Sequence, residues 1–560
     1  MPARISDAQL EVWARRIGEL VKVEGYAPPG KRVADGEINA TSAMADELGL
    51  KRKTFQPTVR KMVEKGFDRH WLTEPRRLPL KPAEASPVRS SGRVYLLTAA
   101  QDDTSIHEAF WANLKAYAKH RDGEILCGGF TYQKGLFTDH SVEAGVFHHE
   151  LAPHLSPSEI NLAPGLVWNG RANIMPTAVN PVSGWDTQSG RSWMTLPHAK
   201  IVLKTIPVMP GQWPKQVMTT GVVTLPNYVE RNQGQKAEFH HTIGALVVEV
   251  AADGNFWCRH IHADADGSFQ DLDTIVHNER ISAGHSIEGL VPGDLHADDQ
   301  DEICARHCLG LALHDREPLP GSMIEVLRPS VWFAHDSFSF APRSHHTIKD
   351  PHERARLFHG GNDNVQAEIR LVSQYLARLR NQGPEIVHVA SNHNMHLDKW
   401  LKEGSAHIDA PNARYWHELN MKWHRAIEHG ANHRWLIHEE AMRAESQDRL
   451  EGVRFLAEGE SYEICQGVNP IECGLHSHVG PRGARGSVNN LSNVPVRMII
   501  GHGHSPAIKE GVRRSGTLGN RQPSYAAKGP GDWMPAHVIA TPNGKTQTIT
   551  QTEDGRWRLG

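Results

Sequence analysis

Five short clusters of His, Asp and Asn carry the residue types that bind divalent metal ions. They read Gly-Asp294-Leu-His296, Ala-His335-Asp336, Ser-Asn392-His393-Asn394, Gly-Leu-His476-Ser-His478 and Gly-His502-Gly-His504. Two cations about 3.5–4 Å apart can share one carboxylate, activate a water and hold a phosphoryl group from both sides. Such a pair needs one bridging Asp together with imidazole, carboxylate and amide ligands. The clusters therefore predict a two-metal hydrolase.

Four of these clusters follow short apolar stretches that are typical of buried strands. The stretches cover residues 289–292, 331–334, 386–390 and 496–500. In open α/β sheets, ligands collect outside the carboxyl ends of the strands. We therefore expect the clusters to meet at one edge. A single His or Asp after a strand is more often a turn cap than a ligand, but five clusters in one region favour a metal site.

The order of the clusters resembles the calcineurin-like metallophosphoesterase superfamily over about residues 285 to 545. The resemblance implies a first metal held by Asp294, His296 and His504, a second held by Asn392, His476 and His502, and a bridge between them at Asp336. It also implies that His393 lies over the leaving group as a general acid or transition-state stabiliser.

Three positions depart from the family pattern. His335 stands where the family has Gly, Asn394 stands where it has an acidic residue, and the fourth cluster offers His478 as well as His476. The change at Asn394 removes a carboxylate that would orient His393 and raise its pKa. This difference bears on the role of His393 as a general acid, and it does not affect the residues expected to bind the metals.

The ligand types also bear on the metal and on substrate binding. Imidazole, carboxylate and carboxamide ligands without thiolate suit manganese, iron or zinc better than magnesium or calcium. Resemblance to the nuclease branch favours two Mn²⁺ ions. Arg343 follows Asp336 closely, and a guanidinium can grip a phosphate through two parallel hydrogen bonds. The alternative is that Arg343 lies in an exposed turn.

Composition is that of a globular protein, with 22% charged and 7% aromatic residues among 560. No run approaches the roughly 18 apolar residues of a membrane span, and the N-terminus carries charges where a signal peptide has its apolar core. We therefore expect a cytoplasmic protein without a membrane partner. The six cysteines make no disulfide framework, and Cys304 and Cys308 fit buried helical thiols better than a zinc site.

The N-terminal segment is basic, with 18 Lys and Arg against 12 Asp and Glu in residues 1–93, whereas the whole chain has a net charge of -3. A helix from Thr41 that stops at Gly49, followed by a second helix over residues 57–65, predicts a helix-turn-helix. Arg60, Lys61 and Lys65 would then be placed to meet DNA phosphates. The alternative is a helical hairpin that packs on a neighbour or a subunit.

These elements suggest an α/β protein with three parts. A helical domain over residues 1–75 and a linker over 76–92 precede a mixed α/β to β-rich domain of unknown role, residues 93–284. The resemblance makes residues 285–560 a metallophosphoesterase β-sandwich flanked by helices. Apolar residues at helical spacing, among them Trp416 and Trp423, predict a helical insertion over residues 412–456.

The whole chain also resembles the large pre-early proteins of certain tailed bacteriophages that degrade host DNA. This favours a phage-encoded, metal-dependent DNase, acting in the host cytoplasm, with DNA as partner and with self-association. The net charge of -3 gives no broad electrostatic footprint for a duplex. Two alternatives are a phosphatase acting on small molecules or phosphoproteins, and a DNA-binding regulator with a vestigial phosphatase domain.

Overall fold

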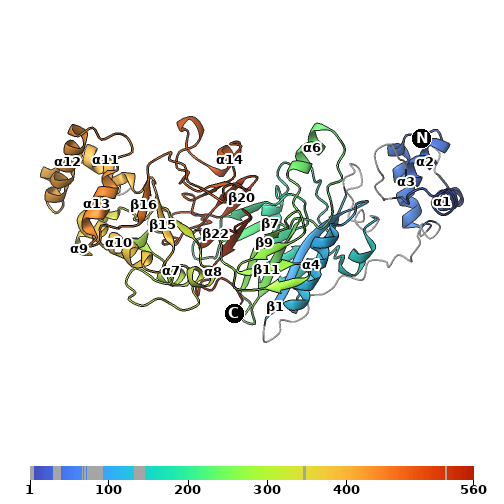
Figure 1. Cartoon of the computed structure of the whole chain (residues 1–560), viewed down its shortest axis with the longest axis horizontal. Coiled ribbons are helices and arrows are strands. Elements are labelled where there is room, and N and C mark those ends of the chain that lie inside the picture. The colour runs from blue at the N-terminus through green and yellow to red at the C-terminus, as the bar shows by residue number, and fades with distance from the viewer. Residues whose placement is uncertain are drawn as a thin grey trace.

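The computed structural model describes residues 5–29, 39–65, 67, 71, 92–131, 146–344, 348–523 and 526–559. Helices α1 (Asp7–Lys22), α2 (Ala40–Glu47) and α3 (Arg52–Glu64) lie at one end of an elongated molecule, and α12 (Ala413–Glu428) lies at the other, with the sheets between them (Figure 1). The expected linker falls outside the described residues except for Gly92. In the described part, no helix is both long and apolar enough to cross a membrane.

Helices α1 to α3 enclose a small apolar core to which Leu10, Met44 and Phe55 belong. The expected start of the second helix at Pro57 is wrong, because α3 begins at Arg52 and Pro57 lies inside it. Proline removes one helical hydrogen bond, but Phe55 and Val59 on either side of it are buried, and this packing keeps the segment helical. The use of α2 and α3 as a DNA-binding motif stays a prediction.

Arg60, which is predicted to contact DNA, instead forms an ion pair within the chain. The Arg60 side chain is buried, and its Nη2 donates to Asp102 Oδ2 at 2.7 Å. Lys61 and Lys65 are exposed, and Lys65 pairs with Asp7 at 3.1 Å. Arg60 therefore joins the N-terminal helices to the following domain, and only the lysines remain at the surface.

The middle of the chain contains a four-stranded sheet covered by a helix. Its strands are β2 (Glu124–Phe130), β1 (Arg93–Gln101), β8 (Gly244–Val250) and β9 (Phe256–His262), in that order. Helix α4 (Glu108–His120) connects the parallel pair β1 and β2, and a small sheet of β10 (Phe269–Asp271), β11 (Thr274–His277) and β12 (Arg280–Ser282) packs against α4. A hairpin that turns at Asp253-Gly254 joins β8 and β9.

A ten-stranded sheet combines strands from the middle and the C-terminal parts of the chain. Its order is β17 (Glu463–Ile464), β18 (Ile471–Glu472), β19 (Met498–Ile500), β21 (Val512–Arg514), β20 (Ala507–Lys509), β6 (Leu203–Ile206), β7 (Lys215–Thr219), β5 (Trp193–Leu196), β4 (Leu166–Asn169) and β3 (Glu159–Ala163). The two parts meet where β20 pairs antiparallel with β6.

A six-stranded sheet packs against the C-terminal half of that sheet. Its order is β16 (Val453–Leu456), β15 (Glu385–Val389), β14 (Val331–Ala334), β13 (Gly289–Val291), β22 (Ala536–Ala540) and β23 (Thr546–Thr550). Phe333 and Val389 from this sheet share an apolar cluster with Ile464 and Ile499 from the other. The overall class is mixed α/β, as expected.

Helices cover the other face of the six-stranded sheet. They include α7 (Glu302–Leu309), α8 (Met323–Leu327), α10 (Val365–Arg380), α11 (Met395–Glu403) and α13 (Ile437–Glu445). The helical insertion expected over residues 412–456 is shorter, because α12 and α13 end by Glu445 and residues 453–456 form β16. Trp416 is partly buried and donates to the Trp400 carbonyl at 3.3 Å, as expected of packing. All six cysteines are free and buried.

A buried ionic network holds α4, β8, β9 and β10 together around Arg259, which is 2% exposed. Its guanidinium donates to both Glu249 oxygens, at 2.8 and 2.9 Å, and to both Asp271 oxygens, at 2.6 and 2.8 Å. Tyr117 and Gln547 also donate to Asp271. The network thus links the middle sheet to β23 near the end of the chain.

Replacing Arg259 with Met should destabilise the protein by about 3–5 kcal/mol, because two buried carboxylates lose their compensating charge. The measurement is the free energy of unfolding from urea titration. The matched control is Arg16→Met, which removes a partly exposed arginine from carboxylates on the N-terminal helices, and it should change the unfolding midpoint little. Equal losses in the two variants would contradict the assigned role of Arg259.

Candidate metal centre

The loops that follow five strands converge on one buried site. Asp294 and His296 follow β13, Asp336 follows β14, Asn392 and His393 follow β15, His476 follows β18, and His502 and His504 follow β19. Because β13, β14 and β15 run parallel as neighbours, their carboxyl ends lie at the same edge of the six-stranded sheet. The ten-stranded sheet delivers the other three residues to the same place.

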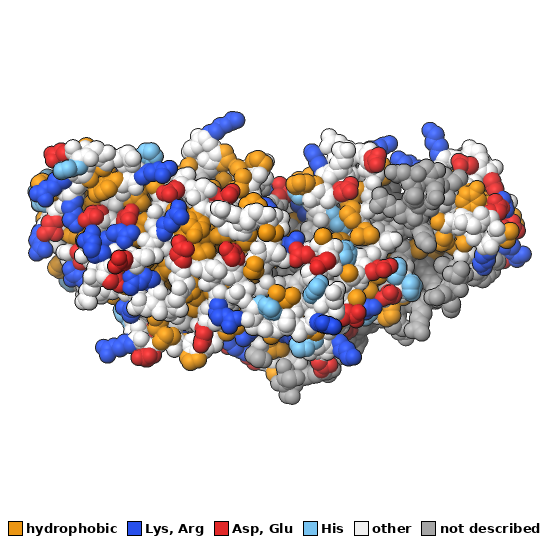
Figure 2. All heavy atoms as spheres, in the orientation of Figure 1, with side chains coloured by type: hydrophobic (Ala, Val, Ile, Leu, Met, Phe, Trp, Pro, Cys, Tyr) orange, Lys and Arg blue, Asp and Glu red, His pale blue; other side chains and the backbone are white. Residues whose placement is uncertain are grey.

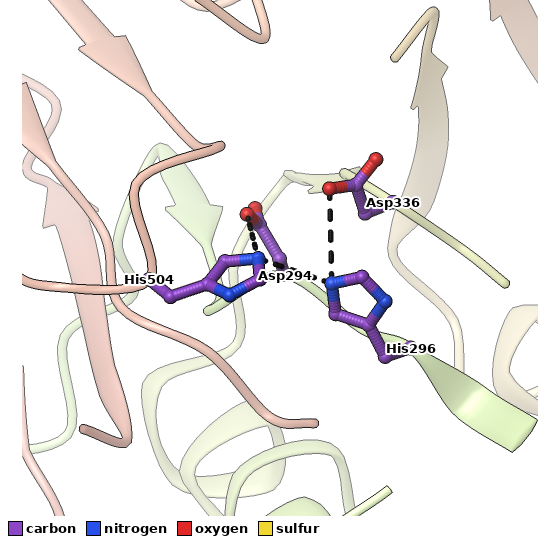
Figure 3. Close-up of side chains that lie close together, drawn as sticks. All are labelled: Asp294, His296, Asp336 and His504. Carbon is purple, nitrogen blue, oxygen red and sulfur yellow. Dashed lines mark hydrogen bonds and ion pairs between the residues drawn. The ribbon is translucent and has the colours of Figure 1, made fainter. Parts of the chain in front are cut away.

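The first group consists of Asp294, His296, Asp336 and His504, whose ligand atoms all lie within 4.8 Å of one another. His504 Nε2 lies 3.2 Å from Asp294 Oδ2, and His296 Nε2 lies 3.1 Å from His504 Nε2 and 3.7 Å from Asp336 Oδ2. Figure 3 shows the two carboxylates and the two rings pointing toward one another. This is the set expected for the first metal, together with the predicted bridge.

A second group of Asp336, His476 and His502 satisfies the same distance limit and shares Asp336 with the first. His476 Nε2 lies 3.1 Å from Asp336 Oδ2 and 3.0 Å from Asn392 Oδ1. His478 belongs to neither group. The arrangement therefore brings together all seven residues expected as ligands, and it places His476, rather than His478, at the centre.

Burial sets the protonation of these side chains. It lowers the pKa of His296 to about 3, and the nearby His393 and His504 rings act in the same direction. It likewise lowers the pKa of His502 to about 4. Burial disfavours the charged form of Asp336, but His476 and His393 hold its pKa well below the ordinary value. His296 and His502 thus offer neutral imidazoles beside an ionised carboxylate, which are the forms that bind metal ions. At His476 burial lowers the pKa, but Asp336 and Asp294 outweigh it and raise the pKa above its ordinary value.

Unsatisfied oxygens support the fit to cations. Asp294 Oδ1 is buried and accepts no hydrogen bond, and the nitrogens nearest to the buried Asp336 Oδ2 are those of two ring ligands, His476 Nε2 at 3.1 Å and His296 Nε2 at 3.7 Å. A buried carboxylate oxygen without a donor is costly unless a cation compensates it. The donor set of carboxylate, imidazole and amide groups therefore suits divalent metal ions.

His335 also belongs to the site, although sequence patterns predict no role for it. It is fully buried, its Nδ1 lies 3.2 Å from His476 Nδ1, and the two rings are stacked. Asp294, His335 and His476 also form a third group of close ligand atoms. A hydrogen bond at Nδ1 leaves Nε2 of His476 to face Asp336, so His335 orients a ligand. The only sequence signal was its departure from the family pattern.

His393 obtains its orientation from Ser339 rather than from residue 394. Its Nδ1 lies 3.0 Å from the Ser339 carbonyl oxygen, and its ring lies 4.7 Å from that of His296. Asn394 is turned away, with its side-chain oxygen bonded to Ser391. A backbone carbonyl thus replaces the carboxylate that the sequence lacks.

Arg343 is not brought together with the ligand residues. Its side chain is buried, Nε donates to Asp409 Oδ2 at 2.6 Å, and the terminal nitrogens donate to Asp409, to Asp363 and to the Pro342 carbonyl. Because its donors are occupied by two carboxylates, the guanidinium stabilises the local fold and has no free donor pair for a phosphate. It is neither an exposed turn residue nor a free phosphate ligand.

The backbone at the centre is unusual at four ligand positions. His296, Asp336, His502 and His504 have φ of 38°, 42°, 70° and 55°, in the left-handed region. Such residues cluster at functional sites. Gly501 allows close approach here, because a Cβ at that position would lie 2.4 Å from Asp294 Oδ1 and 3.0 Å from His476 Nδ1.

Because Asp336 belongs to both groups, Asp336→Asn should remove Mn²⁺ binding at both sites, whereas His478→Ala should leave it unchanged. The measurement is metal content and calorimetric titration with Mn²⁺ on folded protein, with circular dichroism to check folding. His296→Ala, which alters only the first group, should weaken one class of site. Full Mn²⁺ binding by folded Asp336→Asn would refute the shared-ligand arrangement.

Comparison with known proteins gives one clear likeness. The chain is 28% identical to Protein A1 of Escherichia phage T5 over 476 residues, which is 83% of each chain. No protein-family model matches the chain, and no solved structure matches it. The metallophosphoesterase resemblance therefore stays a prediction carried by the five clusters. The likeness to a bacteriophage protein over most of the chain fits the phage link that the sequence suggests.

Proposed function

We propose that this protein is a phage-encoded, metal-dependent DNA phosphodiesterase. The observation that carries the proposal is the overlap of two groups of buried ligand atoms at Asp336. When bound, two divalent ions at adjoining sites activate a water and neutralise the charge that develops on a phosphoryl group. Phosphoester hydrolysis is the chemistry that such a pair of sites serves best.

DNA is favoured as the substrate by the likeness to a phage protein and by the N-terminal helices. Lys51, Arg52, Lys53 and Lys61 are exposed on and just before α3, where they can contact phosphates. On the face drawn in Figure 2, Lys and Arg side chains are mixed with Asp and Glu. Binding would then depend on a few local contacts and not on a broad basic surface.

The chain's own residues provide the proton chemistry of this proposal. The imidazole Nδ1–H of His393 donates to the Ser339 carbonyl at 3.0 Å, which leaves Nε2 for the substrate. To protonate a departing oxygen, Nε2 must carry a proton, so His393 acts as an imidazolium. Asp336 meanwhile stays ionised between the two ligand groups.

A phosphatase acting on small molecules is the second candidate. The observation in its favour is a cavity of about 430 Å³ beside His296, His393 and His504. A cavity of this size accommodates a small ligand. Hydrolysis of mononucleotides without cleavage of DNA would favour this candidate.

The test of the proposal is cleavage of end-labelled DNA by the purified protein with Mn²⁺. We expect metal-dependent cleavage that a chelator stops and that Asp294→Asn reduces by at least about 10²-fold. Gly529→Ala is a suitable control, because a Cβ at that position meets no atom within 4 Å. Absence of DNA cleavage by metal-loaded wild-type protein would refute the DNase proposal.

The acid role of His393 gives a separate prediction. His393→Ala should slow cleavage of DNA by about 10²- to 10⁴-fold. It should slow hydrolysis of a nitrophenyl phosphodiester far less, because nitrophenolate departs without a proton. The measurement is kcat for both substrates at equal Mn²⁺ occupancy. Equal losses on the two substrates would assign His393 to binding or positioning instead.

A further inference from the structure

A cavity of about 430 Å³ adjoins the candidate metal centre. His296, His393 and His504 form the wall that it shares with the ligand residues. Further lining residues come from α9 (Pro351–His359) and from the loop that leads into α10, Leu357 and Asn362 among them. A group joined to a phosphate at the centre would therefore extend directly into this cavity.

The charge of the lining excludes a second phosphate as its occupant. The described lining residues include four acidic ones, Asp298, Asp299, Glu353 and Glu368, and no Lys or Arg. Those of them that are ionised repel a phosphate, and all of them accept hydrogen bonds from neutral N–H groups. The cavity thus suits an uncharged group that carries hydrogen-bond donors.

Glu368 adds a donor to the lining. It is 8% exposed, and its Oε1 accepts a hydrogen bond from the Phe340 backbone N–H at 2.7 Å. Burial, assisted by the nearby Asp298, raises the pKa of Glu368 well above its ordinary value. A protonated carboxyl both donates and accepts hydrogen bonds. Asn362 and Asn520 line the same cavity and offer amides of the same dual kind.

Trp533 supplies an aromatic surface. It lines the cavity, and its ring lies 4.1 Å from the His504 ring at an interplanar angle of 80°. A nucleobase is a neutral, planar group with both hydrogen-bond donors and acceptors. A nucleoside links such a base to a phosphate through its sugar. Aromatic side chains and amides are the groups with which proteins hold unstacked bases.

We propose that the cavity binds one unstacked nucleoside joined to the phosphate that is cleaved. The inference rests on the proposed DNA phosphodiesterase function and specifies its substrate as an unpaired nucleotide. A base within a closed duplex cannot enter unless it leaves the stack, at a cost of pairing and stacking. Single strands and frayed ends are therefore the preferred substrates, and the interior of a duplex is a poor one.

The test uses a single-stranded oligonucleotide with one abasic nucleotide, the same strand intact, and the intact strand in a blunt duplex. Wild-type protein with Mn²⁺ should cleave at the abasic position at least about tenfold more slowly than at the same position of the intact strand, since base contacts are lost. It should also cut internal positions of the duplex more slowly than those of the single strand.

Leu357→Trp places a larger side chain in the lining of the cavity. It should raise KM for the intact single strand and remove the difference between abasic and intact positions, while Mn²⁺ binding stays within about twofold. Phe358→Trp is the matched control, because the neighbouring Phe358 is 60% exposed and does not line the cavity. It should leave unchanged both the KM for the intact strand and the difference in rate between abasic and intact positions.

The outcomes separate the two proposals. If wild-type protein binds Mn²⁺ but cleaves no DNA, the proposed function fails. If it cleaves DNA but cuts abasic and intact positions equally, or if Leu357→Trp matches Phe358→Trp, the DNase proposal stands and the nucleoside cavity is refuted.

Discussion

The candidate centre depends on the stability of one buried carboxylate. Asp336 is inaccessible to solvent and lies among imidazoles delivered by the loops after β13, β18 and β19. Asp294 is equally buried and adds a second negative charge close by. Two acids buried together repel each other unless positive charge lies between them. Neutral imidazoles at His296 and His502 supply ligand atoms without supplying that charge. Burial lowers the pKa of His476, but the two carboxylates raise it above its ordinary value, so this ring supplies one positive charge and bound cations would supply the rest.

The loops resist this repulsion through backbone hydrogen bonds to one another. Leu295 N–H donates to the His335 carbonyl at 3.0 Å, and His296 N–H donates to the Asp336 carbonyl at 2.8 Å, so the first two clusters extend the pairing of β13 with β14. Left-handed backbone at a residue other than glycine costs about 1–3 kcal/mol. That strain persists at His296 and Asp336 because the two loops hold each other. Ligand geometry is thus a property of paired loops, and single side chains do not determine it.

The strands and the ligand clusters could be predicted from the sequence because each signal is local. An apolar stretch followed by His, Asp or Asn marks a strand end, and the structure places β13, β14, β15 and β19 where such stretches lie. The fates of Arg60 and Arg343 could not be predicted, because their partners Asp102, Asp363 and Asp409 are distant in the sequence or lie in other elements. The start of α3 at Arg52 could not be predicted from local sequence, because burial of Phe55 and Val59 outweighs the local effect of Pro57. The cavity depends on which walls face each other, and sequence patterns carry no information about that.

The pairing of β6 with β20 has a consequence for how the chain is made. Residues 203–206 find their partner only at residues 507–509, so during synthesis the nascent chain carries an open strand edge while residues 207–506 are translated. An open edge pairs readily with other chains, and contacts so distant in sequence form slowly. Folding of this sheet and completion of the His502 and His504 loop are therefore late and simultaneous events. The candidate centre thus assembles only after residues 502–504 have been translated.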